Sequence, residues 1–156
     1  MRKNWKTYLF WIGICEAVGV ISGLLSREGI DIYSYTVNKP PLTPPGWVFP
    51  VVWTILFALM GISAARISLS APTKQRDVAL GFFVVQLIVN FFWPLFFFNA
   101  QAFGFSLLWL ILLWVLVLIT IIRFYKIDMT AAWLMLPYLA WLTFAAYLNG
   151  GVWLLN

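Results

Sequence analysis

Histidine is absent from this sequence, and cysteine occurs once, as Cys15. These absences exclude a disulfide framework within one chain, zinc sites built from cysteine and histidine, cysteine–histidine nucleophiles and histidine-ligated haem. Charge is scarce as well, since Asp, Glu, Lys and Arg make up only 10% of the 156 residues. No conventional catalytic constellation is expected, and no metal site.

Hydrophobic residues dominate what is present. They account for 63% of the chain, aromatic residues alone for 19%, and the mean hydropathy is +0.93. A soluble domain of this length cannot keep so much apolar surface from water. The composition therefore predicts an all-α integral membrane protein, with a single membrane domain over residues 1–156.

Five apolar runs are long enough to cross a bilayer as helices. They cover about residues 8–25, 43–67, 78–98, 105–124 and 131–155, and an outer loop spans 26–42. The first run follows a basic start, as in a signal peptide. It is too long for one and carries Glu16 near its middle, so we expect it to be retained as the first helix of a five-helix bundle.

The positive charges predict an orientation. Eight of the ten basic residues fall on the side of the N-terminus and two on the other side. The eight are Arg2, Lys3, Lys6, Arg66, Lys74, Arg76, Arg123 and Lys126, and the two are Arg27 and Lys39. Because cytoplasmic segments are rich in Lys and Arg, this bias predicts the N-terminus inside and the C-terminus outside. Topology thus accounts for the net charge of +5, and no nucleic-acid partner is expected.

The start of the second span is rich in residues that favour a helix end or a helix kink. Thr43 followed by Pro44 predicts an N-cap and the first helical residue. Pro50 then falls inside the predicted helix, where it removes a hydrogen bond and is expected to kink the helix just before Trp53.

Three spans each present a face of aromatic, amide or small residues. These faces are Trp53, Phe57 and Gly61 in the second span; Gln86, Asn90 and Trp93 or Pro94 in the third; and Pro137, Trp141, Ala145 and Leu148 or Asn149 in the fifth. Pro94 cannot donate to the Asn90 carbonyl, which opens the backbone beside that amide. The polar groups either contact a ligand or form ordinary interhelical hydrogen bonds, and a face such as that of Trp141, taken alone, is more often helix packing than a site.

Glu16 is an acidic residue in the middle of a span. A buried carboxyl there is expected to be protonated, or bonded to a polar neighbour such as Gln86 or Asn90. A proton relay or a ligand contact is the alternative. Gly19 and Gly23 form a Gly-x-x-x-Gly pattern, which predicts close helix packing either within the bundle or in a homodimer.

Three blocks of this sequence resemble the TspO/MBR family, that is, the translocator protein, tryptophan-rich sensory protein and peripheral benzodiazepine receptor family. The blocks are Lys39-Pro40-x-x-x-Pro44-Pro45-x-Trp47 with Val52-Trp53-x-x-Leu56-Phe57 and Met60-Gly61; Gln86-Leu87-x-x-Asn90-x-x-Trp93-Pro94-x-x-Phe97-Phe98; and Pro137-Tyr138-Leu139-x-Trp141-x-x-Phe144-Ala145-x-x-Leu148-Asn149. The resemblance implies a five-helix bundle, commonly dimeric, that binds porphyrins, haem, sterols and isoquinoline carboxamides beneath the first loop. We expect it in a bacterial cell membrane.

The chain departs from the family pattern at several positions. Leu42 stands where a loop tryptophan is usual, and Trp109 where a carboxylate is often found. The residues after Leu148 supply neither the tyrosine nor the basic residue of the C-terminal sterol-recognition consensus. Sterol binding through that motif is therefore not expected.

The residue pattern and the resemblance together predict one cavity in the outer half of the bundle, covered by residues 26–46. Its ligand-binding residues are Trp53, Phe57, Gln86, Asn90, Trp93, Trp141, Ala145 and Leu148, together with Pro44 and Lys39. Aromatic walls suit a flat macrocycle, the amides can orient its polar groups, and Lys39 or Arg27 can meet propionates. Haem would be held by stacking or by a weak axial ligand such as tyrosine, and no resident cofactor is expected.

Four functions are consistent with this pattern. We favour a membrane-embedded binding protein or sensor for tetrapyrroles, acting in the regulation of their metabolism or in a stress response. A transporter of porphyrin or sterol is an alternative, although the chain lacks the internal repeat common in secondary transporters. The others are an enzyme that degrades porphyrin photo-oxidatively through Trp53 and Trp141, and a purely structural membrane subunit.

Overall fold

The computed structural model describes residues 4–156, so Arg2 and Lys3 of the charge count lie outside the described residues. Five helical segments are long and apolar enough to cross a membrane. They are α1 (Asn4–Leu25), α3 (Val48–Ser68), α4 (Lys74–Pro94) with its π-helical continuation η1 (Leu95–Asn99), α5 (Phe103–Tyr125) and α6 (Met129–Leu155). The described residues contain no strand. The prediction of an all-α, five-span membrane protein is confirmed.

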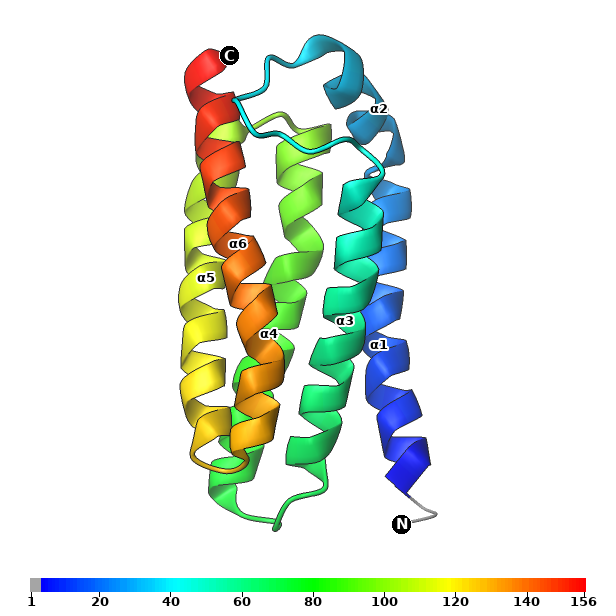
Figure 1. Ribbon diagram of the computed structural model, residues 1–156, viewed down its shortest axis with the longest axis vertical. Coiled ribbons are helices and arrows are strands. Elements are labelled where there is room, and N and C mark those ends of the chain that lie inside the picture. The colour runs from blue at the N-terminus through cyan, green and yellow to red at the C-terminus, as the bar shows by residue number, and fades with distance from the viewer. Residues whose placement is uncertain (1–3) are drawn as a thin grey trace.

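The long helices form a closed bundle in the order α1, α3, α6, α5 and α4, and α4 returns to α1 (Figure 1). Of these neighbouring pairs, α1 and α4 are the most loosely packed. The start of α1 and the end of α6 lie at opposite ends of the bundle, as an odd number of spans requires (Figure 1). The charge bias remains the basis for predicting which end faces the cytoplasm.

The bundle centre is filled by large side chains. Among the fully buried ones are Tyr138, Phe83, Phe124 and Met60. Two glycines permit close approaches: a Cβ at Gly61 would lie 2.5 Å from Ile12 Cα, and one at Gly19 would lie 2.5 Å from the Phe57 ring. Gly19 therefore permits close packing within the bundle, which was one of the two alternatives for the Gly-x-x-x-Gly pattern. Gly23 has open space beside it.

The second span begins later than the sequence predicted. α3 starts at Val48, and Thr43 is not its N-cap, because the Thr43 hydroxyl donates to a carbonyl three residues earlier at 2.7 Å. Two consecutive prolines, Pro44 and Pro45, explain the difference, since a residue before proline avoids the helical region. Pro50 consequently falls in the first turn of α3. An N–H there would have no acceptor within the helix, so the predicted cause of a kink is removed.

The predicted outer loop at 26–42 contains a helix that the sequence analysis missed, α2 (Arg27–Thr36). α2 lies across the end of the bundle where α1 ends (Figure 1). Gly29 approaches the backbone of Phe98, where a Cβ would lie 2.6 Å from the carbonyl carbon. Tyr33 is buried and packs edge-on against Phe98, with ring centroids 5.2 Å apart. α2 is thus fastened to η1.

The third span is longer than predicted at its start. Thr73 caps α4 by accepting a hydrogen bond from Arg76 N at 3.1 Å, so the helix begins four residues before the predicted position. Its α-helical part ends at Pro94, and the five residues of η1 follow in π-helical geometry. Proline has no N–H to donate, which accounts for a change of hydrogen bonding at this point.

Candidate functional site

A tyrosine hydroxyl joins the two amides that the sequence singled out. Tyr138 in α6 donates to Gln86 Oε1 at 2.8 Å and accepts from Asn90 Nδ2 at 2.6 Å. Gln86 Nε2 lies 4.0 Å from Met60 Sδ in α3. All of these side chains are buried. The cluster bonds α4 to α6 across the bundle centre and reaches α3.

Two aromatic rings of α3 lie against this cluster. The Trp53 ring meets the Tyr138 ring edge-on, with centroids 6.1 Å apart, and lies 5.5 Å from the Phe57 ring. Phe57 is buried and Trp53 is half-buried. The predicted aromatic face of the second span and the predicted amide face of the third span therefore meet through Tyr138.

Trp141 and Ala145 continue the same face of α6 beyond the tyrosine. The half-buried Trp141 ring packs edge-on against Phe49, with centroids 6.0 Å apart. Phe49 lies one turn before Trp53 on α3, so both tryptophans face the seam between α3 and α6. Ala145 is buried in the same core, and Leu148 is buried one turn further along.

Trp93 belongs to a second polar cluster, which is centred on Asn149. Trp93 Nε1 donates to Asn149 Oδ1 at 3.1 Å, and the Ser106 hydroxyl donates to the same oxygen at 3.2 Å. Asn149 Nδ2 donates to the Phe103 carbonyl at 2.8 Å. These bonds tie α4, α5 and α6 together. They correspond to the interhelical hydrogen bonding that the sequence left open as an alternative to ligand contact.

Lys39 caps a helix in this structure. Its ammonium group donates to the carbonyls of Tyr33 at 3.0 Å, Ser34 at 3.3 Å and Val37 at 3.0 Å. It also lies 4.7 Å from the centroid of the Tyr33 ring. A lysine carries three N–H donors, so all of them have acceptors at the C-terminal end of α2. An anionic ligand would have to replace some of these carbonyls.

The segment between α2 and α3, residues 37–47, crosses the end of the bundle and is pinned to α6 (Figure 1). The Tyr147 hydroxyl donates to the Pro41 carbonyl at 2.7 Å. Asn156 Nδ2 donates to the Asn38 carbonyl at 2.8 Å, and Asn38 N donates to Asn156 Oδ1 at 3.1 Å. Pro44 is half-buried in this segment. Exposed hydrogen bonds and the buried residues Val37 and Pro40 fasten this segment to the bundle.

Sequence reasoning missed Tyr138 as the centre of the site. It stands in the third family block, directly after Pro137, but it was read there only as part of a pattern. The available signal was a phenol at membrane depth, which needs a hydrogen-bond partner when buried. The fastening residues Tyr147 and Asn156 gave no comparable signal, because their partners are backbone atoms of an irregular segment.

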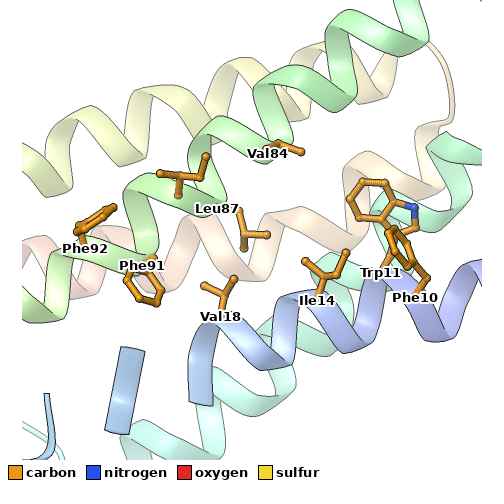
Figure 2. A pocket seen from close by; sticks show the side chains of 9 residues that line it. Phe10, Trp11, Ile14, Val18, Val84, Leu87, Phe91 and Phe92 are labelled. Carbon is orange, nitrogen blue, oxygen red and sulfur yellow. The ribbon is translucent and has the colours of Figure 1, made fainter. Parts of the chain in front are cut away.

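Two grooves on the bundle lie away from the predicted binding residues. One, of about 530 Å³, is a groove between α1 and α4 (Figure 2). Its lining consists of Phe10, Trp11, Ile14, Val18, Val84, Leu87, Ile88, Phe91 and Phe92. The other, of about 320 Å³, lies between α5 and α6. The first groove offers no polar group that would orient a ligand, so its surface suits lipid hydrocarbon.

Glu16 lies apart from the Tyr138 cluster. It is half-buried on α1 and makes no hydrogen bond or ion pair with another described residue. Its predicted partners, Gln86 and Asn90, bond to Tyr138 instead. The expected pairing is therefore absent. Within residues 4–156, no three side chains among His, Cys, Asp and Glu gather as metal ligands would.

Comparison with known proteins identifies the family. A sequence model described as the TspO/MBR family matches residues 11–154. The chain belongs to the TspO/MBR family. It is 37% identical to the tryptophan-rich protein TspO of Chlorobaculum tepidum, over 100% of this chain and 99% of that protein. It is 39% identical to protein CrtK of Rhodobacter capsulatus, over 91% of this chain and 88% of that protein. It is also 37% identical to the human translocator protein, over 85% of this chain and 79% of that protein.

Proposed function

We propose that this TspO/MBR family membrane protein binds tetrapyrroles, porphyrin or haem, between α3, α4 and α6, and acts as their sensor in the regulation of tetrapyrrole metabolism or in a stress response. The observation that carries the proposal is the Tyr138 cluster. One buried hydroxyl bonds to two buried amides, and the ring that carries this hydroxyl packs edge-on against Trp53. An apolar site with a few convergent polar groups is the usual composition of a small-molecule site.

The chemistry of the cluster suits a flat aromatic ligand. Trp53 and Trp141 face the same seam and offer ring faces for offset stacking. The hydroxyl and amides can exchange their mutual hydrogen bonds for bonds to pyrrole nitrogens or side-chain carbonyls of the ligand. Since the sequence contains no histidine, haem would be held by stacking rather than by a strong iron ligand.

Binding at this place requires the seam between α3 and α6 to open. Phe57 and Tyr138 are buried, so a macrocycle has to displace packed side chains or the segment 37–47 above them. The hydrogen bonds that fasten this segment are exposed to solvent. Each exposed bond contributes only about 0.5–1.5 kcal/mol, because water competes for the same groups. Lifting this segment breaks these bonds and also exposes Val37 and Pro40, which are buried.

A pair of bulky substitutions tests the location. Ala145→Phe adds a ring one turn from Trp141 on α6, whereas Val84→Phe fills the apolar groove between α1 and α4 (Figure 2). Porphyrin titration of each purified variant, followed by tryptophan quenching, should show lost binding for Ala145→Phe and parental binding for Val84→Phe. The reverse result would place the ligand in the α1–α4 groove. Circular dichroism establishes that both variants are folded.

The names of the relatives point to two roles. One relative, from Cereibacter sphaeroides, is named a tryptophan-rich sensory protein, and the mammalian ones are named translocator proteins. Porphyrin flux into proteoliposomes separates these roles, because a sensor binds without moving its ligand across the bilayer. New absorbance bands on illumination that are lost in Trp53→Phe would instead indicate degradation. We propose the cell membrane of a bacterium as the location.

We also propose that two copies pair through α1. Only 11% of the apolar stretch of α1 is buried within the chain, against 33–39% for the other spans. A Cβ at Gly13 or Gly23 would meet nothing within 4 Å, which leaves room for a second helix. Glu16 also lies on α1, and a carboxyl at membrane depth needs a polar partner. A partner copy would supply one.

A further inference from the structure

The groove between α5 and α6 differs from the larger one in having a lysine among its lining residues. It lies where these two helices join, and its apolar lining includes Ile122, Trp133 and Leu136. Tyr125 and Lys126, the last residue of α5 and the residue after it, complete the lining. The groove therefore runs from apolar side chains to a cationic end.

Lys126 is free to meet an anion. Its side chain is exposed and makes no hydrogen bond or ion pair with residues 4–156. The carboxylate nearest to it in sequence, Asp128, is held by Arg66, with Nε 2.8 Å from Oδ2 and Nη2 3.4 Å from Oδ1. Arg123 points elsewhere, since its guanidinium lies 4.8 Å from the centroid of the Phe82 ring on α4. Lys126 is thus an uncompensated positive charge at the end of the groove.

The aromatic residues place this end at the membrane surface. Tyr125 is 56% exposed and Trp133 is 60% exposed. Tyrosine and tryptophan gather where hydrocarbon meets headgroups, because their rings are apolar and their O–H or N–H groups are polar. Lys126 follows Tyr125 at the end of α5, so the charged end of the groove lies where the bilayer interface is expected.

We propose that this groove binds an anionic phospholipid, with an acyl chain along Ile122 and Leu136 and the phosphate at Lys126. Basic pockets between membrane helices recognise such headgroups. The surrounding bilayer supplies this ligand, so a groove on the outside of membrane-spanning helices meets lipid before any other partner. The α1–α4 groove has no charged lining residue and gives no reason for headgroup preference.

Native mass spectrometry of the detergent-purified full chain tests the proposal. The protein is incubated with phosphatidylglycerol or phosphatidylcholine of identical acyl chains, and lipid adducts are counted. The parent should retain phosphatidylglycerol about fivefold better, the size expected from one lysine beside an anionic headgroup. Lys126→Gln should abolish that preference. Lys74→Gln is the matched control, since it removes an exposed lysine at the start of α4, at the same end of the bundle (Figure 1).

A second variant tests the apolar part separately. Ile122 is 49% exposed, so Ile122→Trp fills the groove without disturbing the core. It should reduce adducts of both lipids alike. The proposal is overturned if Lys126→Gln keeps the parental preference, or if Lys74→Gln loses as much of it. Parental adduct levels in Ile122→Trp would also overturn it. Displacement of the lipid by an equal concentration of inorganic phosphate would show that a phosphate group alone is recognised.

Discussion

The Tyr138 hydroxyl and the Gln86 amide oxygen lie 2.8 Å apart at the centre of the bundle, and neither side chain reaches the surface. Asn90 donates to the same hydroxyl, so one oxygen serves two helix-to-helix bonds. In a medium of low dielectric such bonds are strong, and losing one partner leaves the others unsatisfied. This relationship gives the cluster a structural role that holds whether or not a ligand is bound.

The first prediction follows from that role. Tyr138→Phe removes the hydroxyl and leaves Gln86 Oε1 and Asn90 Nδ2 without their partner, so the free energy of unfolding should fall by about 1–3 kcal/mol. Tyr147→Phe removes an exposed hydroxyl and should cost less, about 0.5–1.5 kcal/mol. Denaturation in detergent, followed by circular dichroism, measures both. Equal losses would mean that burial of the cluster adds nothing.

The second prediction concerns the aromatic walls. If porphyrin stacks in the α3–α6 seam, Trp53→Ala and Trp141→Ala should each weaken its binding by about 2 kcal/mol, or roughly thirtyfold in Kd. Trp133→Ala is the matched control, because this tryptophan lies 60% exposed in the α5–α6 groove. Fluorescence titration gives the three constants. A comparable loss in the control would indicate non-specific partition of porphyrin onto surface tryptophans.

Much of the fold could be predicted from the sequence because a bilayer permits few backbone structures. Backbone polar groups must be satisfied within each span, so apolar runs of this length become helices, and five were found where five were expected. Helical spacing brings the rings of Trp53 and Phe57 together, with centroids 5.5 Å apart, whereas Gly61 lies against Ile12 on α1.

The missed features depend on short or irregular segments. α2 has 10 residues, two acidic side chains and no apolar run, so its stability comes from contacts with η1 such as that of Tyr33 with Phe98. The role of Lys39 depends equally on α2, whose terminal carbonyls it caps. To predict the role of Tyr138, one would have to know that α4 and α6 face each other across the bundle centre. No local pattern carries that information.

The third prediction is the orientation. With the N-terminus in the cytoplasm, a cysteine at Lys74 lies inside, and a cysteine at Tyr35, which is 84% exposed on α2, lies outside. In a Cys15→Ala background, a membrane-impermeant maleimide added to intact cells should label Tyr35→Cys alone. Labelling of Lys74→Cys alone would invert the topology.

The fourth prediction is a dependence of stability on pH. Burial acts to raise the pKa of Asp128, but hydrogen bonds from Arg66 and its charge outweigh this, and the pKa lies below its ordinary value of 3.8. A carboxyl whose pKa is lower in the folded state stabilises the fold above its unfolded pKa, and this contribution is lost as pH falls through the folded value. The stability advantage of the parent over Asp128→Asn should therefore be full near neutral pH and should shrink below about pH 4.

Asp77, which forms an exposed ion pair, is the control for Asp128. Asp77 pairs with Arg76 at 3.1 Å, but its side chain is 68% exposed. Such pairs contribute little because water and salt screen them. Asp77→Asn should therefore stay close to the parent at every pH. An unchanging difference between the parent and Asp128→Asn across the acid range would mean that packing, rather than the charge of Asp128, joins α3 to α6.

The last prediction concerns Glu16, for which the chain itself provides no partner among its described residues. Glu16→Leu removes no bond within one copy, so the free energy of unfolding of the monomer should stay within about 0.5 kcal/mol of the parent. If two copies meet along α1, the same change should lower the dimer fraction in lipid bilayers, as counted by single-molecule photobleaching. Glu16→Gln keeps a hydrogen-bonding group and should preserve the dimer. Easier unfolding of Glu16→Leu with an unchanged dimer fraction would place the role of the carboxyl inside the bundle, and the α1 interface would then be rejected.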